Sequence, residues 1–152
     1  MVRPWLDFGL DTAEVTLPEL LADAGYRNRA LVGKWHLGHS RKAYHPLSRG
    51  YSYFYGHLNG AIDYFQLKRE GERDWHENFS PSPDTGYATD LIGDKAVQLL
   101  RTYSQQDAPF FLQVAFNAPH SPLQAKRKYL DQYGFDPSQA TFAKGRGRGN
   151  TK

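Results

Sequence analysis

Hydrophobic residues recur at helical spacing near the start of the chain and then give way to a short apolar run. Thr16 and Glu19 have the spacing of a capping box at the start of this helix, and Gly25 ends it. The run Arg29–Val32 that follows is predicted as a strand, so helix and strand alternate as in an α/β sheet. The apolar positions that predict a short amphipathic helix over residues 17–24 are Leu17, Leu20, Leu21 and Ala24.

A longer helix and a second strand are predicted in the second half of the chain. An apolar stripe with i, i+3, i+4 spacing predicts a helix from residue 85 or 87 to residue 103, with Asp84 or Thr85 as its cap. The nearly unbroken apolar run 109–116 is typical of a buried parallel strand. Residues 117–122 lie directly beyond the C-terminal end of this strand, where ligands bind in open α/β sheets. A last short helix is predicted over residues 128–133.

Between these halves, residues 34–84 show little periodicity and are rich in Gly, Pro, Tyr and His. A stretch of this length inside a compact domain is either functional or contains short elements that pattern analysis misses. The aromatic cluster over residues 49–56 is expected to pack against the rest of the protein.

Composition and charge exclude several classes of protein. The 152 residues contain no Cys, which excludes disulfides, thiolate metal sites and a cysteine nucleophile. No apolar run approaches the roughly 20 residues of a membrane span, and we expect no secretory signal or membrane role. The net charge of +3 comes from residues 126–152, which carry seven Lys or Arg against two Asp. No aromatic residue follows Phe142 to stack bases, so we expect no nucleic-acid partner, although a tail that contacts nucleic acid is the alternative.

Two short motifs at strand ends carry the candidate chemistry. Gly33 precedes Lys34 and His36, which offer a permanent cation and a group that titrates near neutral pH. His120 lies between two prolines in the segment after the second strand. Parallel strands of one sheet bring their C-terminal ends to the same edge, so these residues predict a shared site for an anionic phosphate or sulfate ester. The alternative is that all three side chains merely face solvent or a turn.

A third group of polar residues lies in the aromatic middle. His45, His57, Asp63 and His76 have no spacing typical of a metal site, and we interpret them as packing or surface residues.

Five segments in the same order resemble the type I sulfatases, and the chain is most similar to the arylsulfatase B-like branch. The resemblance covers roughly residues 14–135, whereas the residues before Glu14 and from about Thr141 do not resemble the family. The matching segments are Thr16–Tyr26 with Ala30–Gly38, Arg49–Gly56, Gly60 with Asp63-Tyr64, Tyr87–Asp90, and Phe110–Leu112 leading to Pro119–Leu123.

The resemblance implies an alkaline-phosphatase-like α/β sandwich with a mainly parallel sheet flanked by helices. It implies a partial catalytic domain over residues 14–140. The alternation of Gly and Arg predicts a disordered basic tail over residues 141–152. The resemblance also implies that Lys34 and His120 contact a sulfate group and that His36 assists turnover. The family's substrates are sulfated small molecules or glycans, and its cofactor is calcium. Its members are usually secreted, periplasmic or lysosomal, although this sequence itself assigns no compartment.

The departures from the family pattern concern the reaction itself. In the family, a formylglycine made from the Cys or Ser of a C/S-x-P-x-R motif is the nucleophile, and this sequence has no such motif. The acidic pair near the N-terminus and the Asp-Asn or Asp-Gln pair that hold calcium in the family are also absent. Asp131-Gln132 is not the family's pair, because it lies in the predicted helix after the His120 segment. We therefore expect an internal fragment that is inactive alone, since it lacks a nucleophile. A non-catalytic anion-binding remnant and a phosphoesterase of the same fold are the alternatives.

Overall fold

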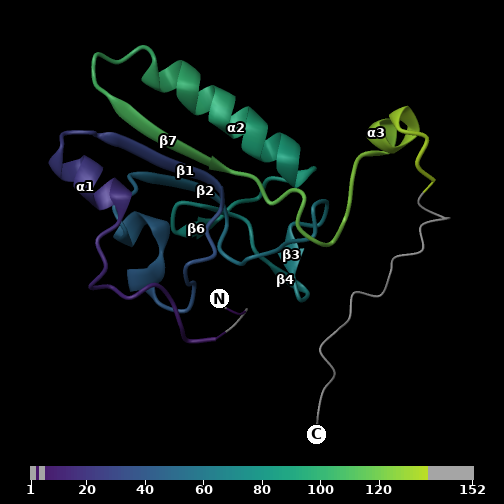
Figure 1. The fold of residues 1–152 in the computed structure, drawn as a ribbon, viewed down its shortest axis with the longest axis horizontal. Helices are drawn as coiled ribbons and strands as arrows, with labels where there is room; N and C mark the ends of the chain where they lie inside the picture. Colours follow the sequence, from purple (N-terminus) through teal and green to yellow (C-terminus); the bar gives the residue numbers. More distant parts are fainter. Residues whose placement is uncertain (1–2, 4–5, 137–152) are drawn as a thin grey trace, which may run out of the picture.

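The computed structural model describes residue 3 and residues 6–136, which form a mixed sheet with helices on its faces (Figure 1). The strand order is β6-β5-β2-β1-β7. The central strands β1 (Asn28–Lys34), β2 (Tyr53–His57) and β7 (Phe110–Ala115) are parallel, whereas the two-residue strands β5 (His76–Glu77) and β6 (Ser80–Pro81) continue the sheet in antiparallel fashion. A separate hairpin contains β3 (Lys68–Arg69) and β4 (Glu72–Arg73).

The helices confirm most of the predicted pattern. Helix α1 spans Leu17–Asp23, helix α2 spans Ala88–Tyr103 and helix α3 spans Arg127–Gln132. Two 3₁₀ turns, η1 (Lys42–Tyr44) and η2 (Pro46–Ser48), precede β2. The predicted domain boundary near residue 140 and the predicted disorder of the tail lie outside the described residues.

Alternation along the central strands divides the core into two clusters. Val32 of β1 and Tyr55 of β2 pack on the face that α2 covers, together with Trp75 and Ile92. Their neighbours Leu31 and Phe54 point to the other face and join a second cluster that contains Trp35 and Tyr51. Helix α2 contacts all three central strands, and it runs alongside β7 (Figure 1).

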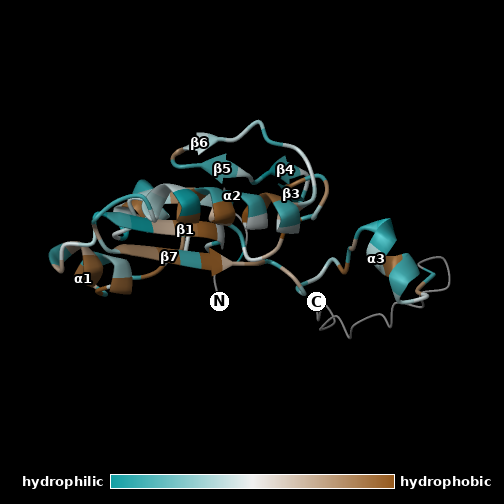
Figure 2. Ribbon diagram, turned by 90° about the horizontal axis from the view of Figure 1, so that it is seen from above, coloured by the Kyte–Doolittle hydropathy of each residue, from teal (hydrophilic) through white to brown (hydrophobic). Residues whose placement is uncertain are grey.

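Two expectations about the second half were wrong. The strand β7 is parallel as predicted, but it is not buried, because β7 lies at the end of the described sheet and Val114 is 38% exposed. Figure 2 shows the apolar colouring of this edge strand. Neither Asp84 nor Thr85 caps α2, since the helix begins at Ala88, whose amide donates to the Tyr64 carbonyl at 2.7 Å.

The segment after β7 leads away from the sheet. In both views α3 lies apart from the sheet (Figures 1 and 2). None of the helices in the described part of the chain is long and apolar enough to span a membrane.

Candidate active site

Lys34 is the last residue of β1 and lies at the C-terminal edge of the parallel strands. Its register partner on β2 is His57, and the side chains of such partners point to the same face of the sheet. Partial burial lowers the pKa of the Lys34 ammonium below its ordinary value. Lys34 is therefore a cation with restricted access to water, beside a second polar residue.

Two glycines leave no room for a side chain between the strands at this edge of the sheet. Gly33 has a φ of +113°, and a Cβ there would lie 2.0 Å from the Ala115 carbonyl oxygen. Gly56 has a φ of +145°, and a Cβ there would lie 2.0 Å from the Gly33 carbonyl oxygen. Any larger residue would push the strands apart, so these glycines fix the position of Lys34 relative to β2 and β7.

His36 is held by backbone bonds beyond the end of β1. Its amide donates to the Leu58 carbonyl at 3.0 Å, and its φ of 63° is left-handed, which is uncommon for a residue other than glycine. A Cβ on Gly60 would lie 2.3 Å from both Cε1 and Nε2 of the His36 ring. The ring therefore lies directly against the Gly60 backbone, and the surrounding structure fixes its direction.

Trp35 anchors the loop that carries His36 to the core. The indole Nε1–H donates to the Tyr44 carbonyl at 2.8 Å, and the ring meets Tyr51 edge-on at 6.0 Å between centroids. A second contact links this loop to the N-terminal segment, because the Leu10 amide donates to the Leu37 carbonyl at 2.8 Å.

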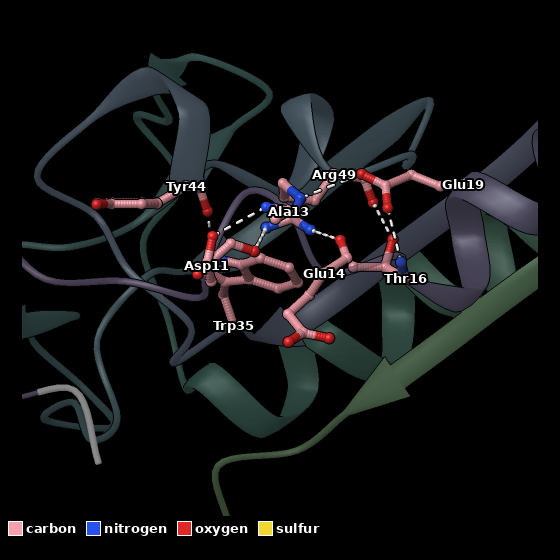
Figure 3. Close-up of polar contacts among 8 residues, drawn as sticks. All are labelled: Asp11, Ala13, Glu14, Thr16, Glu19, Trp35, Tyr44 and Arg49. Atoms are coloured by element: carbon pink, nitrogen blue, oxygen red, sulfur yellow. Dashed lines mark hydrogen bonds and ion pairs between the residues drawn. The ribbon is translucent and has the colours of Figure 1, made fainter.

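Arg49 binds the segment of residues 11–19 through several hydrogen bonds (Figure 3). Its buried guanidinium donates to the Glu19 carboxylate and to the Asp11 carbonyl, both at 3.1 Å, and to the Glu14 carbonyl. The Thr16 amide donates to Glu19 Oε2 at 2.6 Å, which confirms that half of the predicted capping box. Residues 11–19 are thus fixed against the turn that leads into β2.

His57 and Asp74 form a buried polar network beside Lys34. The Asp74 carboxylate accepts bonds from the Leu58 amide at 2.9 Å, the Asn59 amide at 2.8 Å and side chain at 2.9 Å, and His76 Nε2 at 3.1 Å. Burial alone would raise the pKa of Asp74, but the bond from His76, the nearby His57 and the two amides lower it to about 2. A permanent carboxylate therefore organises the loop after β2.

His120 lies on the exposed loop that follows β7. Its Nδ1 is 2.7 Å from the Ser121 carbonyl oxygen, and because a carbonyl only accepts, this ring nitrogen carries the proton. Tyr64 supports the loop by donating its hydroxyl to the His120 carbonyl at 2.8 Å. A cavity of about 650 Å³ opens beside His120, and its lining includes Tyr64, Phe65, Pro119, Leu123 and Tyr129.

The three predicted residues lie at or after the C-terminal ends of strands that reach the same edge of the sheet. Strand pairing sets Gly33 opposite Ala115, so Lys34 and the segment leading to His120 leave adjacent strands in the same direction. The loop 58–64 connects the two halves of the site, because Gly60 lies against His36 and Tyr64 holds the His120 loop. Their individual roles stay predictions.

The four polar residues of the segment 34–84 make two different kinds of contact. His45 packs between Phe54 and Phe79, and Asp63 accepts the amides of the turn that follows it, which confirms packing roles for these two. His57 and His76 instead belong to the Asp74 network, which sequence analysis missed. The structure places no group of three His, Asp or Glu side chains suited to a metal ion anywhere in residues 6–136.

The fold and the site define an α/β protein with one lysine and several imidazoles at the carboxyl edge of its parallel strands. The Sulfatase family model matches residues 2–146 of the chain. The chain belongs to the sulfatase family. The match extends on both sides beyond residues 14–135, so the expectation that the residues before Glu14 and from about Thr141 lie outside the resemblance was too narrow.

Curated relatives agree with this family and extend well beyond the chain. N-acetylgalactosamine-6-sulfatase of Mus musculus is 37% identical over 134 residues, which is 80% of this chain and 25% of the relative. Arylsulfatase J of Mus musculus is 36% identical over 141 residues, which is 88% of this chain and 23% of the relative. The chain thus spans about a quarter of the length of these relatives.

Solved structures confirm the α/β fold expected for a sulfatase. Ps i-CgsB in complex with k-i-k-neocarrahexaose superposes with a TM-score of 0.75 at 29% identity, over 90% of this chain and 33% of that one. A structure solved in complex with its substrate D-glucosamine-2-N,6-O-disulfate gives a TM-score of 0.64 at 26% identity, over 84% and 23% of the two chains.

Proposed function

We propose that this chain forms the sulfate-recognition part of a sulfatase active site. Lys34 and His120 bind the sulfate group, and His36 assists turnover of the ester. The whole enzyme hydrolyses sulfate esters, with the nucleophile supplied by polypeptide that is not among these 152 residues.

The observation that carries the proposal is the partly buried Lys34 ammonium at the carboxyl edge of the sheet. Restricted access to water strengthens the attraction between a cation and an anion. An ammonium that has lost part of its hydration gains more from a sulfate than a fully solvated one does. The His36 ring, held against Gly60, adds a second group of fixed direction, which reduces the cost of ordering the site around the anion.

The residues present do not fit the calcium ion that the family uses. The described part of the chain has no group of three candidate ligands, and the sequence lacks the acidic pairs of the family. The formylglycine motif is absent as well. The 152-residue chain alone therefore binds sulfate without turning over the ester.

A sulfated sugar is the substrate class that we propose for the whole enzyme. Relatives and neighbours include a sulfatase named for N-acetylgalactosamine and structures solved with k-i-k-neocarrahexaose and with D-glucosamine-2-N,6-O-disulfate. The cavity beside His120 is lined by aromatic and aliphatic side chains and is in the size range of small-ligand pockets. A sugar ring in this cavity would direct its sulfate ester towards His120.

Calorimetric titration of the chain with inorganic sulfate tests the proposal. We expect saturable binding that Lys34→Met weakens about tenfold, which corresponds to one charge-assisted hydrogen bond. Lys68→Met is the matched control, because Lys68 is an exposed lysine on the β3–β4 hairpin. Equal affinity in the two variants would contradict the proposed site.

The same titration with phosphate separates the proposal from a phosphoesterase. Tighter binding of phosphate than of sulfate at equal charge would favour the phosphoesterase alternative. Turnover of an aryl sulfate by the chain, abolished by His120→Ala, would contradict the expectation that the chain is inactive alone.

A further inference from the structure

His57 is a fully buried imidazole with one ring nitrogen that the fold leaves unsatisfied. The side chain is 0% exposed and stacks on Trp75 at 6.1 Å with an interplanar angle of 15°. Its Nδ1 lies 2.8 Å from the Asn59 carbonyl oxygen. Its Nε2 is buried and has no hydrogen-bond partner among the residues that the structure describes.

The Asn59 contact fixes the tautomer of this ring. A carbonyl oxygen only accepts hydrogen bonds, so Nδ1 carries the hydrogen and Nε2 carries a lone pair. Burial is the main cause that lowers the pKa of His57 to about 4. Asp74 and the bond to Asn59 act in the opposite direction, and the nearby Lys34 and His36 lower it further. The ring is therefore neutral at neutral pH, and a buried acceptor without a donor costs free energy.

Strand pairing places Lys34 beside this acceptor. The two residues are register partners on adjacent parallel strands. Strand alternation assigns both to the face that Val32 and Tyr55 share with Trp75, on which the His57 ring stacks. The other charged group packed against the ring is Asp74, whose carboxylate is already engaged by Leu58, Asn59 and His76.

We propose that His57 is a positioning residue that offers its Nε2 lone pair to the Lys34 ammonium and directs that ammonium towards a bound sulfate. One ammonium hydrogen is then donated to His57, and the remaining hydrogens face the anion. Because His57 stays neutral, it adds an acceptor without adding a charge that would repel the lysine. This inference rests on the proposed sulfate site.

The tautomer of His57 is tested first, on the wild-type chain. Two-bond ¹H–¹⁵N correlation of histidine-labelled protein at neutral pH is expected to show the Nδ1–H form of a neutral ring. An Nε2–H tautomer or an imidazolium would overturn the proposal. This measurement needs no variant and no ligand.

Substitution tests the coupling between His57 and Lys34. His57→Phe keeps a ring on Trp75 but removes the acceptor, and His57→Gln keeps an acceptor. We expect the pKa of Lys34, followed by NMR of its Cε and Nζ atoms, to fall in His57→Phe and to recover in His57→Gln. Sulfate affinity is expected to fall about tenfold in His57→Phe and to recover towards wild type in His57→Gln.

The control is His45→Phe, another buried histidine that packs between Phe54 and Phe79. This variant is expected to keep the wild-type Lys34 pKa and sulfate affinity. An unchanged Lys34 pKa in folded His57→Phe would overturn the inference, and if that variant fails to fold, the tautomer and His57→Gln decide. A wild-type chain that binds no sulfate would refute the proposed function, whereas the Lys34 pKa in the anion-free chain still tests the coupling.

Discussion

Replacing Arg49 by Met is predicted to be among the most damaging single substitutions in the described part of the chain. The guanidinium is buried, and its ion pair with Glu19 joins a side chain that is 2% exposed to one that is 32% exposed. Burial alone would raise the pKa of Glu19, but bonds from the Thr16 amide and from Arg49 hold it below its ordinary value. Arg49→Met removes this partner and also leaves the Asp11 and Glu14 carbonyls without their donor.

The expected cost follows from these contacts. Breaking a buried ion pair by removing one partner costs about 3–5 kcal/mol. Because Glu19 keeps partial access to water, the lower end applies, and we expect the free energy of unfolding to fall by about 3 kcal/mol. At roughly 2–4 °C per kcal/mol for a chain of this length, the melting temperature should fall by about 6–12 °C.

Thermal and urea unfolding followed by circular dichroism measure this loss. Arg41→Met is the matched control, since the Arg41–Asp7 pair lies at the surface with side chains 61% and 58% exposed. This control is expected to leave the melting temperature nearly unchanged. A loss of stability in Arg49→Met no larger than that in Arg41→Met would show that the buried Arg49 contacts do not stabilise the fold.

Three further predictions concern acid, the Asp74 network and the close contact at His36. Burial lowers the pKa of His45 and His57 to about 4, so the unfolded chain binds more protons than the folded chain between pH 6.5 and about 4. The free energy of unfolding should therefore be highest above pH 6.5. It should fall by up to about 3 kcal/mol for His57 as the pH drops through this window. Urea titrations across this range check it, and a flat profile would contradict it. Asp74→Asn should cost about 2 kcal/mol at neutral pH, and because the folded pKa of Asp74 is depressed, the difference should vanish as pH falls towards 2. A loss that is independent of pH would argue against a charged acceptor. Gly60→Ala, which places a Cβ 2.3 Å from the His36 ring, should keep the fold and weaken sulfate binding about tenfold; unchanged calorimetric affinity would show that the position of His36 is not limiting.

Sequence periodicity was sufficient for the elements whose apolar stripe is continuous. The helix over Ala88–Tyr103 and the strand over Asn28–Lys34 both lie where the pattern predicts them, since each buries one regular set of side chains against the sheet. The burial of β7 was misjudged because the pattern shows that a strand is apolar but does not show whether another element covers it.

The strand β2 was missed for a different reason. Its sequence, YFYGH, begins with three aromatic residues that favour a strand, but it has no β-branched residue, no alternation of polar and apolar positions, and a glycine, which is depleted in strands. Four of its five residues are buried only because β1 and β5 flank it and both faces are covered. Without β2, the position of His57 beside Lys34 was not visible in the sequence.

The Asp74 network depends on contacts that local sequence does not encode. Asp74 reaches Leu58 and Asn59 because the chain reverses between β2 and β5 and pairs antiparallel. In contrast, Lys34, His36 and His120 were found as candidates because each follows an apolar run that ends at the carboxyl edge of the sheet.

Site-resolved NMR of the chain during titration with sulfate tests whether Lys34, His36 and His120 form one sulfate site. We expect the side-chain signals of these three residues to shift together and to saturate with one common dissociation constant. The His45 signal, from a ring enclosed by Phe54 and Phe79, should stay in place. Saturable shifts confined to other lysines and arginines, or no saturation at any of the three residues, would contradict a sulfate site at this edge of the sheet.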